Sequence, residues 1–390
     1  MENKVLKPKI RFKGFTDTWE QRKFKNYFDE RNERTGIGEM ISVTISSGIK
    51  KFSELNRYDS KPDDLSKYKR VVEGDIAYNS MRMWQGASGY SPYTGILSPA
   101  YTVIKPKDGI SAKFFSYQIK RPEMIHQFEL NSQGLTKDTL NLKFPAFSEI
   151  ETTAPIKVNE QNKIAKLLEK VDNLITLHQS KYDKLVNVKK ALLEKMFPKD
   201  GKNVPEIRFK GFTDTWEQRK LVEIANIIMG QSPDGINYTD NPTDNILIQG
   251  NADLDNGMVV PRIWTTQITK ISKPNDIIFT VRAPVGEVAK NTYNAVIGRG
   301  VASISGNNFL YQALKKMKEF DYWSKLSAGS TFDSINSEQL KNSEINIPLN
   351  EEQKQIGNFL EKIDNLITLH QHKLEKLKNM KKSLLNKMFI

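Results

Sequence analysis

Two groups of polar side chains in this sequence could read nucleic-acid bases. Arginine pairs well with guanine, asparagine and glutamine pair with adenine, and serine, threonine and lysine hold phosphates. Residues of these types stand in or beside expected turns in both halves of the chain. The candidate DNA-binding residues are Ser46, Ser47, Lys50, Asn79, Arg82, Trp84 and Gln85 in the first half and Gln231, Ser232, Gln249, Asn251, Arg282, Ser330 and Thr331 in the second, with Arg31, Arg34 and Arg262 beside them.

Motifs for catalysis are missing from the sequence. It contains no GxxxxGK[ST] phosphate loop, no GxGxxG after an expected strand and no GxSxG nucleophile elbow. "DNPTD" at residues 240–244 resembles an amino-methyltransferase motif but lacks its second proline and its aromatic residue. "KPDD" at residues 61–64 lacks the Glu-X-Lys of a nuclease site. We interpret both as loop turns, and we predict no catalytic residue, metal site or bound cofactor.

The charge of the chain favours a polyanionic partner. It has 59 basic and 46 acidic residues, a net charge of +13 and a pI near 9.4. Nucleic acid is the usual partner of such a protein, although a basic surface can also serve solubility alone. The chain has no cysteine, which excludes disulfides and thiolate metal sites. With no signal peptide and no apolar run long enough to span a membrane, it is expected to be cytoplasmic.

The chain is an internal duplication. "IRFKGFTDTWEQRK" occurs at residues 10–23 and again, unchanged, at residues 207–220. "DNLITLHQ" occurs at residues 172–179 and 364–371. We call residues 10–23 and 207–220 the framework segments. Each half of the chain therefore consists of a framework segment, then a variable region, then a helix. We interpret these segments as shared framework that docks each variable region onto the common helices or onto a partner subunit.

Each half is expected to end in a long helix, over residues 159–198 and 350–390. Apolar residues recur every seven positions with Lys and Glu between them, which indicates a coiled coil. Each helix has about 38 residues and so is roughly 57 Å long. Antiparallel pairing within the chain is favoured, and parallel pairing or pairing between chains stays open. The predicted seam residues are Ile164, Val171, His178, Leu185 and Leu192 in the first helix and Ile356, Ile363, His370, Leu377 and Leu384 in the second.

Further apolar residues, among them Leu174, Val188 and Met380, are expected to widen this stripe. His178 and His370 occupy the same heptad position. Two histidines could bind a metal ion, but a polar residue in a seam more often sets the register of the helices.

The variable regions, residues 24–158 and 221–349, have the strand and turn pattern of an α+β fold. "VVEGDIAYNSMRMWQGASG" can be laid over "ISKPNDIIFTVRAPVGEVA", so that Arg82 and Arg282 follow equivalent strands. Either arginine could read a base or could be a partner in a structural ion pair. The expected domains are residues 1–158 and 199–349, with one scaffold and different loops.

The order and spacing of these motifs resemble the specificity subunit of Type I restriction–modification systems. The resemblance rests on the two framework segments, the "GDI" and "NDI" strands, and "IPLNEEQKQIGNFLEKID" with its counterpart "PIKVNEQNKIAKLLEKVD". It covers essentially the whole chain. One departure is an additional residue before Gln161, compared with the sequence before Gln353.

The resemblance implies two target recognition domains that each read one half of a split double-stranded DNA sequence. An antiparallel coiled coil would fix the separation of the two halves. The subunit would be non-catalytic and would recruit two modification subunits, which methylate adenine with S-adenosylmethionine. Two restriction subunits can join them for cleavage driven by ATP with Mg²⁺. The residues themselves leave two alternatives open: a self-sufficient DNA-modifying enzyme, or a coiled-coil scaffold without a DNA role.

Overall fold

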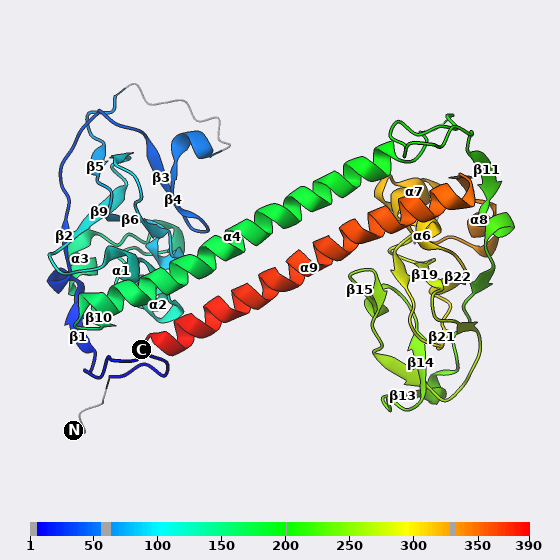
Figure 1. Ribbon diagram of the computed structural model, residues 1–390. Coiled ribbons are helices and arrows are strands. Elements are labelled where there is room, and N and C mark those ends of the chain that lie inside the picture. Colours follow the sequence, from blue (N-terminus) through cyan, green and yellow to red (C-terminus); the bar gives the residue numbers. More distant parts are fainter. Residues whose placement is uncertain (1–5, 56–63, 200, 328–332) are drawn as a thin grey trace. The chain divides into compact units, whose positions relative to one another are not determined.

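The structure, a computed structural model, describes residues 6–55, 64–199, 201–327 and 333–390. The chain divides into two compact units, Met1–Thr176 with Glu375–Ile390, and Leu177–Leu374. Each unit contains one domain of mixed helices and strands together with part of each of two long helices, α4 (Val158–Lys195) and α9 (Asn350–Met388) (Figure 1). The α+β class predicted from the sequence is confirmed.

A four-stranded antiparallel sheet in the order β2-β9-β6-β7 lies at the centre of the first domain. Strands β1 and β10, β3 and β4, and β5 and β8 form three further antiparallel pairs. The elements are β1 (Glu20–Lys23), β2 (Phe28–Glu30), β3 (Ile41–Thr44), β4 (Gly48–Lys51), β5 (Lys69–Val71), β6 (Ile76–Asn79), β7 (Ser88–Tyr90), β8 (Gly95–Leu97), β9 (Tyr101–Pro106), α1 (Ala112–Gln118), α2 (Pro122–Leu130), α3 (Phe144–Glu149) and β10 (Glu151–Ala154).

Aromatic side chains form the core of the first domain. Phe24 and Phe147 stack with ring centroids 4.4 Å apart, and Trp19 is buried in the same cluster, edge-on to Phe114. Phe389, which directly follows α9, stacks on Phe114 of α1 at 5.1 Å. Aromatic rings bury much area each, so these contacts fasten the end of α9 to the core of this domain.

The second domain has a six-stranded sheet in the order β12-β22-β19-β20-β16-β15 and a five-stranded sheet in the order β13-β17-β14-β21-β18. Strands β11 and β23 form a separate pair. The elements are β11 (Glu217–Lys220), α5 (Leu221–Ile224), β12 (Ile227–Met229), β13 (Tyr238–Thr239), β14 (Asn245–Ile248), β15 (Leu254–Asp255), β16 (Met258–Val259), β17 (Ile263–Thr265), β18 (Ile271–Ser272), β19 (Ile277–Thr280), β20 (Val288–Lys290), β21 (Ala295–Ile297), β22 (Val301–Ile304), α6 (Asn308–Glu319), α7 (Tyr322–Ser327), α8 (Ser337–Asn342) and β23 (Glu344–Ile347).

Strand register shows that the two domains share one scaffold. In the first, β6 pairs with β9 and β7, so that Ile76 lies opposite Ile104 and Tyr90. In the second, β19 pairs with β22 and β20, and Ile277 lies opposite Ile304 and Lys290. The order β2-β9-β6-β7 therefore corresponds to β12-β22-β19-β20. The predicted common scaffold is confirmed for these four strands, and β13 and β15–β17 belong to the second domain without a counterpart among the strands of the first.

The framework segments dock each domain onto the helices. Arg11 donates two hydrogen bonds to Glu160 of α4, with N–O distances of 2.6 and 2.8 Å. Arg208 makes the same pair with Glu352 of α9, at 2.7 and 2.8 Å. Both carboxylates are buried and stand in the first turn of their helix, where the helix dipole also favours negative charge. The interpretation as shared framework is thereby confirmed for the helices.

The same segments also bind the last turn of the other helix. The backbone N–H of Ile10 donates to the carbonyl oxygen of Lys387 in α9 at 2.8 Å. The N–H of Ile207 donates to the carbonyl of Lys195 in α4 at 2.9 Å. Carbonyl groups at a helix C-terminus have no partner within the helix, so each segment satisfies one of them. The two identical segments thus make the same backbone and side-chain contacts in both units.

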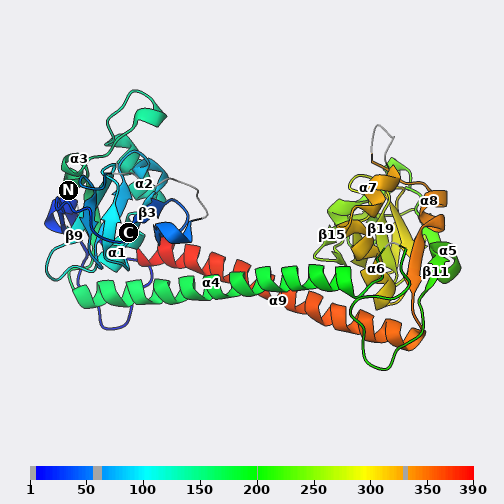
Figure 2. The same ribbon diagram turned by 90° about the horizontal axis from the view of Figure 1, so that it is seen from above.

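The two long helices are antiparallel in each unit. In the second unit, His178 and Lys189 of α4 contact His370 and Asp364 of α9, so the order of contacts along one helix is reversed along the other. In the first unit, the beginning of α4 and the end of α9 enter one apolar cluster. In each unit these parts of α4 and α9 lie side by side (Figure 1 and Figure 2). The predicted antiparallel pairing is confirmed.

All ten predicted seam residues are buried or half-buried. The expectation that Leu174, Val188 and Met380 widen the apolar stripe is wrong, because these three side chains are exposed. A pair of helices covers only a narrow strip of each partner, so positions that flank the heptad seam face solvent. No helix among the described residues has the length and apolar character needed to cross a membrane.

Candidate nucleic-acid interface

Three turns of the second domain meet at the end of its sheets and hold several predicted residues together. Gln231 and Ser232 follow β12, Gln249 follows β14, and the Gly298–Gly300 turn joins β21 to β22. A Cβ atom on Gly300 would overlap the carbonyl oxygen of Gln249. Because only glycine permits this approach, the three turns form one closely packed surface.

Arg299 lies at the tip of this glycine turn and was not singled out from the sequence. Its backbone N–H donates to the Ser232 hydroxyl at 3.1 Å, which ties the turn to the segment after β12. Its flanking glycines in "GRG", between two strands, are the signal that could have revealed it. The side-chain amide of Gln249 donates to the Tyr238 hydroxyl at 2.8 Å, and Asn251 follows in the same loop.

Arg282 and Arg299 line one cleft of about 600 Å³, whose wall also contains Met229, Ser334, Asn336 and Gln339. Both side chains are exposed. Within the described ranges neither guanidinium has an ion pair or a hydrogen bond. Two guanidinium groups at one cleft repel each other and favour an anion or the acceptor edge of guanine between them. Ser330 and Thr331, which are also predicted to bind DNA, lie outside the described residues.

The predicted residues of the first domain form two groups. Ser46 and Ser47 occupy the turn of the β3–β4 hairpin, where the Ser47 N–H donates to the Thr44 hydroxyl at 3.0 Å. Lys50 on β4 lies 3.7 Å from Glu54. An exposed pair of this kind contributes little stability, so Lys50 can exchange its partner for a phosphate.

The second group follows β6. The Asn79 carboxamide accepts the Met81 N–H at 3.0 Å, and the Trp84 indole N–H donates to the Met81 carbonyl at 3.2 Å. Gln85 belongs to the same short turn. Arg82 forms an exposed ion pair with Asp138 at 3.7 Å, whereas Arg282 has no such partner among the described residues.

The expected equivalence of Arg82 and Arg282 is wrong by one residue. Strand register aligns Ile76 with Ile277, which places Met81 at the position of Arg282. The sequence overlay without a gap shifted this turn, because nothing local marks which residue pairs across the sheet.

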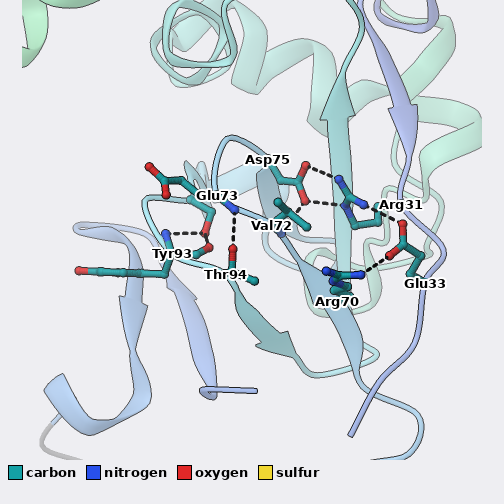
Figure 3. Close-up of polar contacts among 9 residues, drawn as sticks. Arg31, Glu33, Arg70, Val72, Glu73, Asp75, Tyr93 and Thr94 are labelled. Carbon is teal, nitrogen blue, oxygen red and sulfur yellow. Dashed lines mark hydrogen bonds and ion pairs between the residues drawn. The ribbon is translucent and has the colours of Figure 1, made fainter. Parts of the chain in front are cut away.

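Two carboxylates hold the Arg31 guanidinium in place (Figure 3). Its Nε and Nη2 donate to the two carboxylate oxygens of Asp75 at 2.7 and 3.1 Å, and Nη1 donates to Glu33 at 2.8 Å. These bonds raise the pKa of the Arg31 guanidinium, first through the Asp75 hydrogen bond. Asp75 is buried and also accepts the Val72 N–H, so Arg31 compensates a buried carboxylate. Arg70 donates to the other carboxylate oxygen of Glu33 at 3.2 Å, so Glu33 bridges the two arginines in Figure 3.

The other two arginines differ in their surroundings. Arg262 donates to the Ala252 carbonyl at 2.9 Å and thereby holds a loop. Arg34 is exposed.

The histidines of the seam face each other, with Nδ1 atoms 2.7 Å apart. One imidazole must donate and the other accept, so this contact requires at least one neutral ring. The described residues contain no group of three or more His, Cys, Asp or Glu side chains that could hold a metal ion. The contact is the type of polar pairing in a seam that fixes helix register.

Comparison with known proteins agrees with this architecture. Residues 20–187 and 213–379 each match the family model described as the Type I restriction modification DNA specificity domain. These two matches cover most of the chain, so the chain belongs to this family and carries two copies of its domain. It is a DNA specificity protein of the Type I restriction–modification class, as the resemblance predicted.

Two relatives come from Methanocaldococcus jannaschii. The chain is 28% identical to the putative type I restriction enzyme MjaX specificity subunit, over 95% of this chain and 92% of that protein. It is 23% identical to the type I restriction enzyme MjaVIII specificity subunit, over 82% and 81%. The fold resembles that of the S subunit of a Type I restriction–modification system from M. genitalium, with a TM-score of 0.69, 15% identity and 99% of each chain covered.

Proposed function

We propose that each domain reads one half of a bipartite, asymmetric DNA target. The observation that supports this most directly is a pair of clefts at the same place of the shared scaffold with different chemistry. The cleft of the first domain, about 280 Å³, has Met81 and Pro99 in its wall. At the corresponding positions the second cleft has Arg282 and Arg299.

The correspondence follows from the strands. Met81 and Arg282 each stand two residues after β6 or β19, and Pro99 and Arg299 each stand two residues after β8 or β21. One scaffold therefore presents a methionine and a proline in one domain and two arginines in the other. Base edges differ in their donors and acceptors, so these sets would select different bases.

The helix pair would set the distance between the two half-sites. Residues of α4 and α9 contribute to both compact units, and a helix of 38 residues is roughly 57 Å long. One helical turn of DNA is about 34 Å, so such a pair is long enough to span one to two turns. Inserting one heptad in each helix is expected to change the number of unspecified bases before it changes either half-site.

The chemistry would reside on other subunits in the cytoplasm. The proposed partners are two modification subunits that use S-adenosylmethionine to methylate adenine, with two restriction subunits that use ATP and Mg²⁺. This chain would be their non-catalytic specificity subunit. The family assignment and the missing catalytic motifs support this division of labour. Methyl transfer by the isolated chain with S-adenosylmethionine and DNA would contradict it.

Mapping of methylated adenines in genomic DNA, with and without this chain, tests the proposal. Replacing residues 24–158 with the region of a relative should change one half-site and leave the other intact. A change in both half-sites, or in neither, would contradict the assignment of one half-site to each domain.

Arg299 provides a sharper test in the same assay. Loss of a bidentate contact to guanine costs about 1–3 kcal/mol, or roughly 5-fold to 150-fold. Arg299→Ala should therefore relax methylation at one base pair of the second half-site. The first half-site in the same sample is the internal control, and equal loss at both would contradict a reading role for Arg299.

A further inference from the structure

Leu135 is the most exposed large apolar side chain among the described residues, and it stands in the loop between α2 and α3 of the first domain. A single exposed leucine is ordinary, so its surroundings decide whether it has a role. Leu130 at the end of α2 is also exposed, as is Met81 in the turn that the loop contacts through Arg82 and Asp138. Exposed apolar side chains therefore stand on the loop, on the helix before it and on the turn that it contacts.

The loop that carries Leu135 is held in one shape. Gln133 and Asn141 exchange backbone N–H to carbonyl hydrogen bonds of 3.1 and 2.8 Å, which close its base. The Thr136 N–H donates to the Thr139 hydroxyl at 3.0 Å, which stiffens the turn after Leu135. A Cβ atom on Gly134 would lie 2.6 Å from the Thr139 carbonyl oxygen, so this position requires glycine. The apolar tip is therefore preorganised, and its insertion would cost little further ordering.

Cationic side chains anchor the same loop on the turn after β6. Asp138 of the loop forms an ion pair with Arg82 of the turn, at 3.7 Å. The Lys137 ammonium lies 5.5 Å from the centre of the Trp84 ring, and the same ammonium lies 3.4 Å from the Glu129 carboxylate. Both ion pairs are exposed, so phosphate groups can replace the carboxylates at little cost. An apolar tip between an arginine and a lysine is the composition of loops that enter a DNA groove, where the cations bind the backbone and the apolar group separates base pairs.

We propose that Leu135 is an apolar wedge with which the first domain enters the minor groove and partly unstacks one base step of its half-site. Arg82 and Lys137 bind the phosphates on either side. This inference rests on the proposed function, because it adds a deformation step to the reading of one half-site. The inference concerns the first domain alone.

The complex of this chain with its modification subunit tests the wedge. The duplex carries the mapped target, with 2-aminopurine replacing in turn each adenine of both half-sites except the two that are methylated, because a methyltransferase extrudes its own target base. Wild-type protein should raise the fluorescence at one step of the first half-site, because unstacking relieves quenching. Leu135→Ala should abolish that signal and weaken binding roughly tenfold to a hundredfold. Leu135→Met, which keeps an apolar side chain of similar size, should retain both.

Salt dependence separates the wedge from its cationic supports. Leu135→Ala removes no charge, so the slope of log affinity against log salt should stay unchanged. Lys137→Gln should reduce that slope by about one, because one phosphate contact is lost. Ile156→Ala, a truncation of another exposed apolar residue in this unit, is the matched control and should leave fluorescence and affinity at wild-type values.

Two results would overturn the wedge. One is a Leu135→Ala complex with wild-type fluorescence and affinity, and the other is a fluorescence rise confined to the second half-site. The proposed function fails separately, when the wild-type complex methylates no bipartite target. Leu135 is fully exposed, so its substitution should leave the melting temperature unchanged; a drop would assign Leu135 a role in stability and would also contradict the wedge.

Discussion

Arg208→Met should destabilise the second unit strongly, because it leaves the buried carboxylate of Glu352 without its bidentate partner. The Glu352 side chain is fully buried and Arg208 is 13% exposed. Removing one partner of a buried ion pair costs about 3–5 kcal/mol. Glu352 stands in the first turn of α9, where the helix dipole compensates about 0.3–1 kcal/mol of that cost. We therefore expect about 3 kcal/mol.

For a unit of this size, 1 kcal/mol shifts the melting temperature by about 2–4 °C, so the expected decrease is about 6–12 °C. Differential scanning calorimetry of the full chain measures the decrease. Amide hydrogen exchange then locates it, since protection should fall in β11 and β23 of the second unit and stay unchanged in β1 and β10 of the first.

Two variants control this experiment. Lys354→Met breaks an exposed pair with Glu351 and should change stability by less than about 0.5 kcal/mol. The double variant Arg208→Met with Glu352→Leu should recover much of the loss, because an apolar pair can replace a buried ion pair. A melting temperature of Arg208→Met within about 1 °C of wild type would refute the reasoning, as would a double variant no more stable than the single one.

Two further predictions concern the second unit. Gly300→Ala should lower the melting temperature, because its Cβ would overlap the Gln249 carbonyl. Gly250→Ala is the control and should leave the melting temperature unchanged, because its Cβ would meet no atom within 4 Å. Equal melting temperatures for the two variants would show that the turns are less closely packed. Burial, then His178 and two nearby lysines, lower the pKa of His370 from 6.5. The native state therefore binds fewer protons than the unfolded state below about pH 6.5, and the free energy of unfolding should fall as the pH drops from 7 towards 5. In urea titrations followed by circular dichroism, His370→Asn should show a smaller pH dependence, and an unchanged pH dependence would contradict this origin.

Several features of the fold could be predicted from the sequence because they depend on local periodicity or on repetition. A seven-residue apolar repeat requires a partner helix, and two such helices of equal length in one chain suggested the antiparallel pair. Fourteen identical residues at two places implied that one contact is made twice. The ion pairs of Arg11 and Arg208 with a glutamate in the first turn of each long helix are that contact. The strands around Ile76 and Ile277 could be recognised as equivalent because a buried strand keeps its apolar residues, although the overlay was one residue out of register.

The candidate site was predicted less completely, because its chemistry depends on which distant residue each side chain meets. Arg31 and Arg299 are the same residue type beside turns, but Asp75 neutralises one, whereas the other has no side-chain partner among the described residues. Arg299 and Leu135 went unnoticed, since neither belongs to a periodic pattern.

The sequence by itself determined the duplication, the two domains, the helix pair and the family, because repeats and heptads are properties of order along the chain. Only the tertiary structure decided that the framework segments bind buried glutamates, that Met81 and not Arg82 corresponds to Arg282, and that two clefts at one scaffold position carry different side chains. The physical reason is that strand register and burial arise from contacts between residues far apart in sequence, and short spacings do not record such contacts.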